Sequence, residues 1–195
     1  MKTLIAVLGA AILGMTILCP TGCARHTKMD AFADYGFSFE YPAGYTVDER
    51  GNTEGEANSY SSGSMLLSKA APGDSDFYYS LRWATTQDPE ASQRESAPRA
   101  ALGLSTSYLE ESFETTGGSM QVGEIAEDSC SGHKMLHCYY KVVWSQGETV
   151  NGEIGVVYCS ESQRWFELTT RSAHTENEAE ALDFFNVFMS SFVCH

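Results

Sequence analysis

Hydrophobic and polar residues alternate along much of this chain, and the alternation predicts β-strands. Near the start, Phe37, Phe39 and Tyr41 alternate with polar residues, a period of two that is typical of a half-buried strand. Similar segments follow, and the turn Pro72-Gly73-Asp74 indicates a hairpin between two of them. The further expected strands are residues 45–47, 64–70, 76–84, 119–128, 134–146, 150–159 and 164–170.

Two segments have the period of a helix instead. Residues 96–114 form the first, with Ser96 suited to cap it and Pro98 to occupy its first turn. Its core-facing residues are Ala101, Leu102, Ser105, Leu109 and Phe113. The second helix starts at Thr175, which has the spacing of a capping box with Glu178. Its core-facing residues are Leu182, Phe185, Met189 and Phe192.

The order of these elements indicates the fold class. Strands, one helix, more strands and a final helix are typical of an α+β domain with an antiparallel sheet flanked by helices. We place this single domain at residues 32–195, which is long enough to bury a hydrophobic core.

The first 22 residues are expected to be a signal peptide. Lys2 provides a positive start, and an apolar run from Leu4 to Leu18 has the length of a signal core but is short for a membrane-spanning helix. We therefore expect an exported protein. Residues 23–31 would then be a short tether in front of the domain.

Cys23 is the expected site of lipid attachment. The tripeptide Thr21-Gly22-Cys23 resembles a bacterial lipobox, in which the cysteine carries the lipid and becomes the new N-terminus. Pro20 stands where that motif usually has leucine, so ordinary cleavage nearby is the alternative. With the lipid in place, the domain would lie on the outer face of the cell membrane or in the cell envelope, anchored in the membrane through Cys23.

Charge narrows the range of partners. The net charge is −14, and removal of Lys2 with the signal peptide changes it to −15. This excess of acidic residues disfavours nucleic acid and anionic lipid surfaces, because phosphates require clusters of lysine and arginine. We expect no nucleic-acid partner.

Four cysteines follow Cys23, and in an exported domain they indicate two disulfide bonds. We prefer Cys130–Cys138 with Cys159–Cys194, because the second bond would attach the closing helix to the sheet. A hairpin turn centred between residues 148 and 149 would instead place Cys138 opposite Cys159 and leave Cys130 with Cys194. The sequence leaves both pairings open.

The segment Cys130–Cys138 also contains His133 and His137, and two thiols with two imidazoles could form a zinc site. His137 and Cys138 are adjacent in an expected strand, however, so they point to opposite faces. An oxidising compartment also favours disulfides over thiolate ligands. We therefore expect no metal or other cofactor, and keep a metal-binding or catalytic domain that uses this segment as the alternative.

Nothing in the sequence indicates an enzyme. Ser105 lies in Gly103-Leu104-Ser105-Thr106-Ser107, which lacks the second glycine of a nucleophile elbow, and its place on the apolar face of the first helix indicates packing. Neither a His-Glu-x-x-His motif nor a phosphate-binding loop occurs. A non-enzymatic role is the expectation.

One stretch resembles a known family. Residues 35–45 read YGFSFEYPAGY, and this phrase resembles the opening of PsbP-like domains, in which an aromatic strand runs into Tyr-Pro and a turn. The end, Ser190–His195, is also similar, since a helix closes with Ser-Phe. The resemblance implies a PsbP-like α/β/α sandwich and a binding or accessory role, with a protein or a small ligand as the unknown partner.

Overall fold

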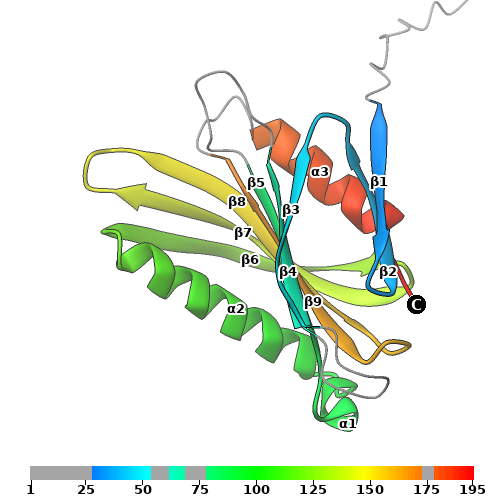
Figure 1. Ribbon diagram of the computed structural model, residues 1–195. Helices are drawn as coiled ribbons and strands as arrows, with labels where there is room; N and C mark the ends of the chain where they lie inside the picture. Colours follow the sequence, from blue (N-terminus) through cyan, green and yellow to red (C-terminus); the bar gives the residue numbers. More distant parts are fainter. Residues whose placement is uncertain (1–27, 54–61, 69–77, 173–177) are drawn as a thin grey trace, which may run out of the picture.

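The computed structural model describes residues 28–53, 62–68, 78–172 and 178–195 (Figure 1). The strands are β1 (Met29–Asp34), β2 (Phe37–Pro42), β3 (Thr46–Thr53), β4 (Ser62–Ser68), β5 (Tyr78–Thr85), β6 (Gly118–Cys130), β7 (His133–Trp144), β8 (Thr149–Cys159), β9 (Arg164–Arg171) and β10 (Val193–Cys194). The helices are α1 (Pro89–Ser92), α2 (Ala97–Glu114) and α3 (Glu178–Ser191). None of these helices combines the length and apolar character needed to cross a lipid bilayer.

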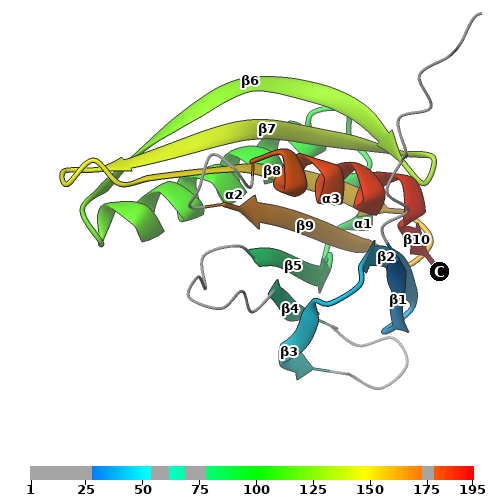
Figure 2. The ribbon, with the colours of Figure 1, turned by 90° about the horizontal axis from the view of Figure 1, so that it is seen from above.

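Two antiparallel sheets organise the chain. The large sheet has seven strands in the order β3-β4-β5-β9-β8-β7-β6, and the small sheet has the order β1-β2-β10. The small sheet lies beside the C-terminal end of α3, as Figures 1 and 2 both show. Helix α3 packs with it on one face of the large sheet, and α2 packs on the opposite face. The expected α+β class with an antiparallel sheet flanked by helices is confirmed.

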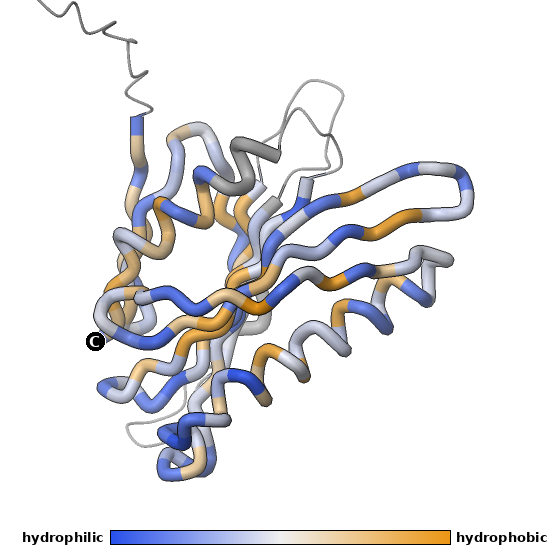
Figure 3. The backbone as a smooth tube through the Cα atoms, turned by 180° about the vertical axis from the view of Figure 1, so that it is seen from behind, coloured by the Kyte–Doolittle hydropathy of each residue, from blue (hydrophilic) through white to orange (hydrophobic). Residues whose placement is uncertain are grey.

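The core between the large sheet and α3 is rich in aromatic side chains. Phe37 and Phe39 of β2 meet Phe188 of α3 and Phe192, which directly follows α3. Phe37 also packs edge-on against Phe166 of β9 with ring centroids 5.2 Å apart. The alternation seen in the sequence therefore points the aromatic residues of β2 into this core. Figure 3 shows hydrophobic residues gathered where the strands cross the middle of the molecule.

A second core lies under α2. Leu102 and Phe113 of the helix are buried against Tyr140, Ile154 and other residues of β7 and β8. Helix α2 packs mainly on β6, β7 and β8. The strands on the other side of β8, which are β9, β5, β4 and β3, therefore extend beyond the helix on this face. The candidate site described below lies there.

Most expected elements are confirmed, with differences at the start of the domain and in two short elements. The strand β1 begins at Met29, so residues 29–31, expected in the tether, pair with β2 instead, and the domain starts before residue 32. The short elements α1 and β10 were not expected. The expected cap at Thr175 lies outside the described residues, as do the signal peptide and Cys23.

Candidate functional site

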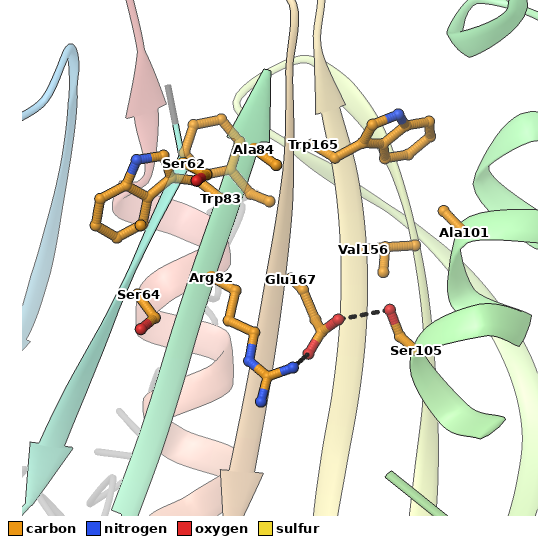
Figure 4. Close-up of a pocket in the computed structure, with 12 residues that line it drawn as sticks. Ser62, Ser64, Arg82, Trp83, Ala84, Ala101, Ser105, Val156, Trp165 and Glu167 are labelled. Atoms are coloured by element: carbon orange, nitrogen blue, oxygen red, sulfur yellow. Dashed lines mark hydrogen bonds and ion pairs between the residues drawn. The ribbon is translucent and has the colours of Figure 1, made fainter. Parts of the chain in front are cut away.

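A cavity of about 550 Å³ opens beside α2 on the face of the large sheet that the helix leaves uncovered (Figure 4). Its floor comes from β4, β5, β9 and β8, and its side wall from α2. The residues that line it are Ser62, Gly63, Ser64, Arg82, Trp83, Ala84, Ala101, Ser105, Val156, Trp165, Phe166 and Glu167. The volume is in the range of about 300–1,000 Å³ that is usual for sites of small ligands.

Strand register sets the side chains of the floor in two rows. One row crosses four strands as Ser64, Arg82, Glu167 and Val156, each opposite the next. The neighbouring row crosses the same strands as Ser62, Ala84, Trp165 and Tyr158. Serine and alanine are small, and this leaves the space open between the larger side chains. The side chains of Trp83 and Phe166 belong to the core on the other face.

The first row carries a charged pair that α2 completes. Arg82 Nη1 lies 3.9 Å from Glu167 Oε1, and Ser105 Oγ donates a hydrogen bond of 2.6 Å to Glu167 Oε2. Figure 4 shows the three side chains converging from β5, β9 and α2. The Arg82 guanidinium also lies 5.1 Å from the ring centroid of Tyr108, a cation–π contact on the exposed side of α2. Both charges are therefore held in fixed places at the cavity.

The second row provides an aromatic wall. The Trp165 ring packs against that of Tyr158 with centroids 5.1 Å apart, and Trp165 Nε1 donates a 3.1 Å hydrogen bond to Ser92 Oγ. Ser92 is buried at the end of α1, and its hydroxyl donates to the backbone carbonyl of Asp88. Asp88 also caps α1, since its Oδ1 accepts from the Ala91 N–H at 2.8 Å. Helix α1 therefore fixes the orientation of the indole.

The lining of this cavity offers groups that can hold a ligand. Its walls combine an indole and aliphatic groups with one cation, one carboxylate and three hydroxyls. Ser105 has a carboxylate partner but no imidazole beside it, because neither histidine nor cysteine occurs among the described lining residues. Activation of a serine requires an adjacent base, usually histidine or lysine. The geometry favours a ligand held by hydrogen bonds at one end and by apolar contact at the other.

Comparisons with known proteins identify the fold. The solution structure of cyanobacterial PsbP (CyanoP) from Synechocystis sp. PCC 6803 matches with a TM-score of 0.61 at 11% identity, covering 91% of this chain and 99% of that chain. The chain has a PsbP-like fold. At this identity the match shows the fold alone. No protein-family model matches the chain, and neither does any curated protein sequence.

Two further solved structures match at lower scores. The Ran-binding protein Mog1p from Saccharomyces cerevisiae has a TM-score of 0.48 at 10% identity, covering 86% of this chain and 96% of that chain. LpqN of Mycobacterium tuberculosis, described as involved in cell envelope biogenesis, has a TM-score of 0.48 at 14% identity, with coverages of 85% and 90%. The PsbP-like fold that the residues 35–45 predict is thus confirmed by CyanoP.

The sequence did not predict the cavity of this PsbP-like domain. Ser105 was expected to pack on the apolar face of its helix, and it instead bonds to Glu167 at the cavity. Arg82 stands between Leu81 and Trp83 and has its side chain on the opposite face of β5 from these two core residues. Glu167 likewise stands between Phe166 and Leu168 in β9, and its side chain lies on the opposite face of the strand from these two core residues. A lone charge between core residues in two strands is the signal that could have indicated the site.

The cysteines of the PsbP-like domain confirm one expected bond and correct the other. Cys159 and Cys194 form a disulfide with their Cα atoms 6.4 Å apart. Cys130 and Cys138 are free and buried, so the preferred Cys130–Cys138 bond is wrong. Cys138 lies opposite Ile125 in β6, five residues before Cys130, and the two thiols belong to the cores on opposite faces of the sheet. The alternative Cys138–Cys159 bond is also wrong, because Cys138 lies opposite Ile154.

The two candidate histidines do not converge. His133 begins β7, where its Nε2 lies 3.3 Å from Glu161 Oε2 and 3.4 Å from Cys194 Sγ. His137 lies four residues along the strand, where Nε2 is 3.1 Å from Asp128 Oδ2 and Nδ1 is 3.5 Å from Glu153 Oε1. Four strand residues span about 13 Å. The segment Cys130–Cys138 therefore does not assemble a single site from both histidines.

The two carboxylates make His137 sensitive to pH. The hydrogen bond to Glu153, with a second to Asp128, raises the pKa of His137 above its usual 6.5, although burial opposes the shift. Because the pKa of His137 is higher in the folded state than in the unfolded chain, protonation of this residue stabilises the fold. This contribution is complete below pH 6.5 and is lost as the pH rises through the pKa of the folded state. We expect His137→Gln to have a lower unfolding free energy than wild type. In urea titrations this difference should be larger at about pH 5.5 than at about pH 8.5. An equal difference at both values would contradict this assignment.

Proposed function

We propose that this chain is an exported, lipid-anchored, non-enzymatic binding domain that holds a small amphiphilic molecule in the cavity beside α2. The observation that carries the proposal is the pairing of a polar row, Arg82, Glu167 and Ser105, with the aromatic wall of Trp165 in one cavity. The PsbP-like fold shared with CyanoP is compatible with an accessory or binding role.

The polar row favours a head group that accepts hydrogen bonds. A guanidinium carries five N–H donors, and a single ion pair at 3.9 Å uses few of them. The side chain of Arg82 is 49% exposed, so its remaining donors can meet a ligand. Glu167 is already bound by Ser105, which limits its repulsion of an anionic or carbonyl oxygen. Trp165, Ala84 and Val156 would contact the apolar body of the same molecule.

The short spacer before β1 would hold the domain close to the membrane. A lipid on Cys23 would be separated from Met29 by residues 24–28, which reach at most about 20 Å when fully extended. An amphiphile that leaves or enters the membrane would then be near the domain. The acidic surface disfavours direct adhesion to anionic lipids, so the anchor rather than charge would provide the membrane attachment.

The cavity is tested with anilinonaphthalene sulfonate, whose fused rings and anionic group match the two rows. We expect saturable binding of one molecule, measured by fluorescence on the folded protein. Ala84→Phe should abolish it by filling the floor. Arg82→Ala should weaken it by roughly 10- to 100-fold, because a hydrogen bond to a charged group contributes about 1.5–3 kcal/mol.

Lys141→Ala is the matched control for Arg82→Ala. Lys141 is exposed on β7, where it lies opposite Asn151, and it does not line the cavity. Its removal changes the net charge by the same amount and should leave the affinity unchanged. If the probe binds Ala84→Phe as tightly as wild type, the proposed cavity is not the binding site.

The anchor is tested on the mature protein extracted from membranes with detergent. We expect its intact mass to include a diacylglycerol at Cys23 and Cys23→Ala to be released into the aqueous fraction. More than one acyl chain is needed for stable anchoring, and each buried methylene contributes roughly 0.8 kcal/mol. A mature chain without the lipid mass would refute the anchor but would leave the cavity proposal standing.

A further inference from the structure

Four metal-binding groups surround the disulfide at one end of the large sheet. One donor atom from each of His133, Cys159, Glu161 and Cys194 lies within 4.8 Å of every other. The four come from separate places in the chain: the start of β7, the end of β8, the turn after β8, and β10. The register Met135–Val157, continued by two residues, places His133 opposite Cys159. The sheet itself therefore brings the imidazole to the disulfide.

Three of the distances among these atoms match the edges of a tetrahedron around zinc. With Zn–S bonds of about 2.3 Å and Zn–N and Zn–O bonds of about 2.0–2.1 Å, tetrahedral ligand atoms lie about 3.3–3.8 Å apart. The observed distances are 3.4 Å from His133 Nε2 to Cys194 Sγ and 3.3 Å from His133 Nε2 to Glu161 Oε2. Cys159 Sγ lies 3.5 Å from Glu161 Oε2.

Only the two sulfurs are too close for such a site. They are covalently bonded to each other, whereas two thiolates on one zinc ion lie about 3.8 Å apart. Cleavage of the bond would free both sulfurs to separate by this amount while the imidazole and the carboxylate remain in place. One imidazole, two thiolates and one carboxylate are all ligands that zinc commonly takes.

We propose that His133, Cys159, Glu161 and Cys194 form a Zn²⁺ site in the dithiol form of this protein, which the disulfide closes. The disulfide and the bound ion exclude each other, so the oxidation state of Cys159 and Cys194 decides whether the domain holds metal. His133 is the one residue of the segment Cys130–Cys138 that takes part. His137 is engaged with Asp128 and Glu153, and Cys138 lies in the other core.

The site has a solvent path and a fixed frame. The side chain of Glu161 is 57% exposed and that of His133 is 17% exposed, so an ion can approach from the turn between β8 and β9. Ser160 Oγ donates a 3.0 Å hydrogen bond to Glu161 Oε2 and supports the carboxylate from outside. Cys194 is held by the pairing of β10 with Phe37 of β2.

The redox step balances with an external dithiol as reductant. A thiolate of the reductant attacks one sulfur of the disulfide and releases the other as a thiol. The second thiol of the reductant then displaces the first cysteine, so the reductant ends as a disulfide and both cysteines as thiols. Zinc binding releases the two thiol protons to water, because only thiolates ligate the ion.

The test uses the full chain in detergent, free of metal, with Zn²⁺ added by calorimetric titration. A phosphine serves as reductant because dithiols themselves bind zinc. We expect one equivalent to bind reduced wild type and none to bind the oxidised form. His133→Ala and Glu161→Gln should each lose more than about 100-fold in Zn²⁺ affinity. Loss of a residue that only supports a ligand typically costs roughly 10–100-fold. His137→Ala and Cys138→Ala are the matched controls and should retain the Zn²⁺ affinity.

Stability provides a second measurement that does not depend on the ligand variants folding well. Reduced wild type and Cys159→Ala/Cys194→Ala both lack the disulfide, but only the former has the thiolates. Zn²⁺ should raise the Tm of reduced wild type and leave that of the double variant unchanged. The proposal is overturned if reduced wild type binds no stoichiometric Zn²⁺, or if the double variant is stabilised equally.

Discussion

Gly152→Ala is expected to lower the free energy of unfolding by about 3 kcal/mol or more, at the upper end of overpacking effects. A Cβ at this position would lie 2.0 Å from the backbone carbonyl oxygen of Thr170 and 2.7 Å from the Tyr140 ring and hydroxyl. The hydroxyl of Tyr140 passes over Gly152 to donate a 2.8 Å hydrogen bond to that same carbonyl. The methyl group would therefore push β8 away from β9 and break this buried bond.

Gly103→Ala is the control for this substitution. Gly103 lies in α2, and no atom beyond its own stretch of helix comes within 4 Å of the place that an alanine methyl group would take. Alanine should therefore stabilise the helix by about 0.5–1 kcal/mol. Urea titrations of the two variants should move the transition midpoint in opposite directions. A Gly152→Ala midpoint close to that of wild type would show that the close approach of β8 and β9 is not required for stability.

The sequence predicted the parts of the fold that depend on local pattern. The alternation of Phe37, Phe39 and Tyr41 identifies a strand whose phenylalanines are buried in one core. The helical period over residues 96–114 agrees with α2 to within one residue at the start. The preference for a Cys159–Cys194 bond rested on a cysteine just beyond the last core residue of the closing helix, and the structure confirms this bond. In each case neighbouring residues carry the information.

The pattern of hydrophobic and polar residues did not predict the register between strands. The β7–β8 turn runs from Trp144 to Glu148, where Gly147 has a φ of +87° and the Trp144 N–H donates to the Glu148 carbonyl oxygen. The alternative pairing required a turn centre between residues 148 and 149, which is later in the chain than the observed turn. The partner of Cys138 is therefore Ile154 instead of Cys159. A small error at a turn propagates along the whole hairpin, because register fixes every facing pair.

The candidate site depends on long-range pairing of the same kind. Arg82 faces Glu167 only because β5 pairs with β9, although more than half of the domain separates them in sequence. Ser105 reaches the carboxylate from a helix on a third segment. The same holds at the disulfide, where His133 and Glu161 converge from different strands and turns. Sequence pattern assigns each residue to an element, and only the pairing of elements assembles a site.

Replacing Cys159 and Cys194 together with alanine is expected to lower the free energy of unfolding by about 3–4 kcal/mol. The bond closes a loop with a sequence separation of 35. Closing a loop of this length lowers the entropy of the unfolded chain and so stabilises the fold by about 3–4 kcal/mol. The bond also ties β10, and with it the end of α3, to β8. The Tm should fall by roughly 6–16 °C, since 1 kcal/mol corresponds to about 2–4 °C in a domain of this size.

Reduction of wild type provides the matched comparison, with a chelator present so that metal binding does not contribute. A phosphine should shift the wild-type transition to that of Cys159→Ala/Cys194→Ala and leave the double variant unmoved. The free thiols cannot replace the lost bond, because burial raises the pKa of Cys130 to about 12 and that of Cys138 to about 11 and keeps both protonated and unreactive. A wild-type transition that reductant does not move would show that the Cys159–Cys194 bond does not restrain the unfolded chain.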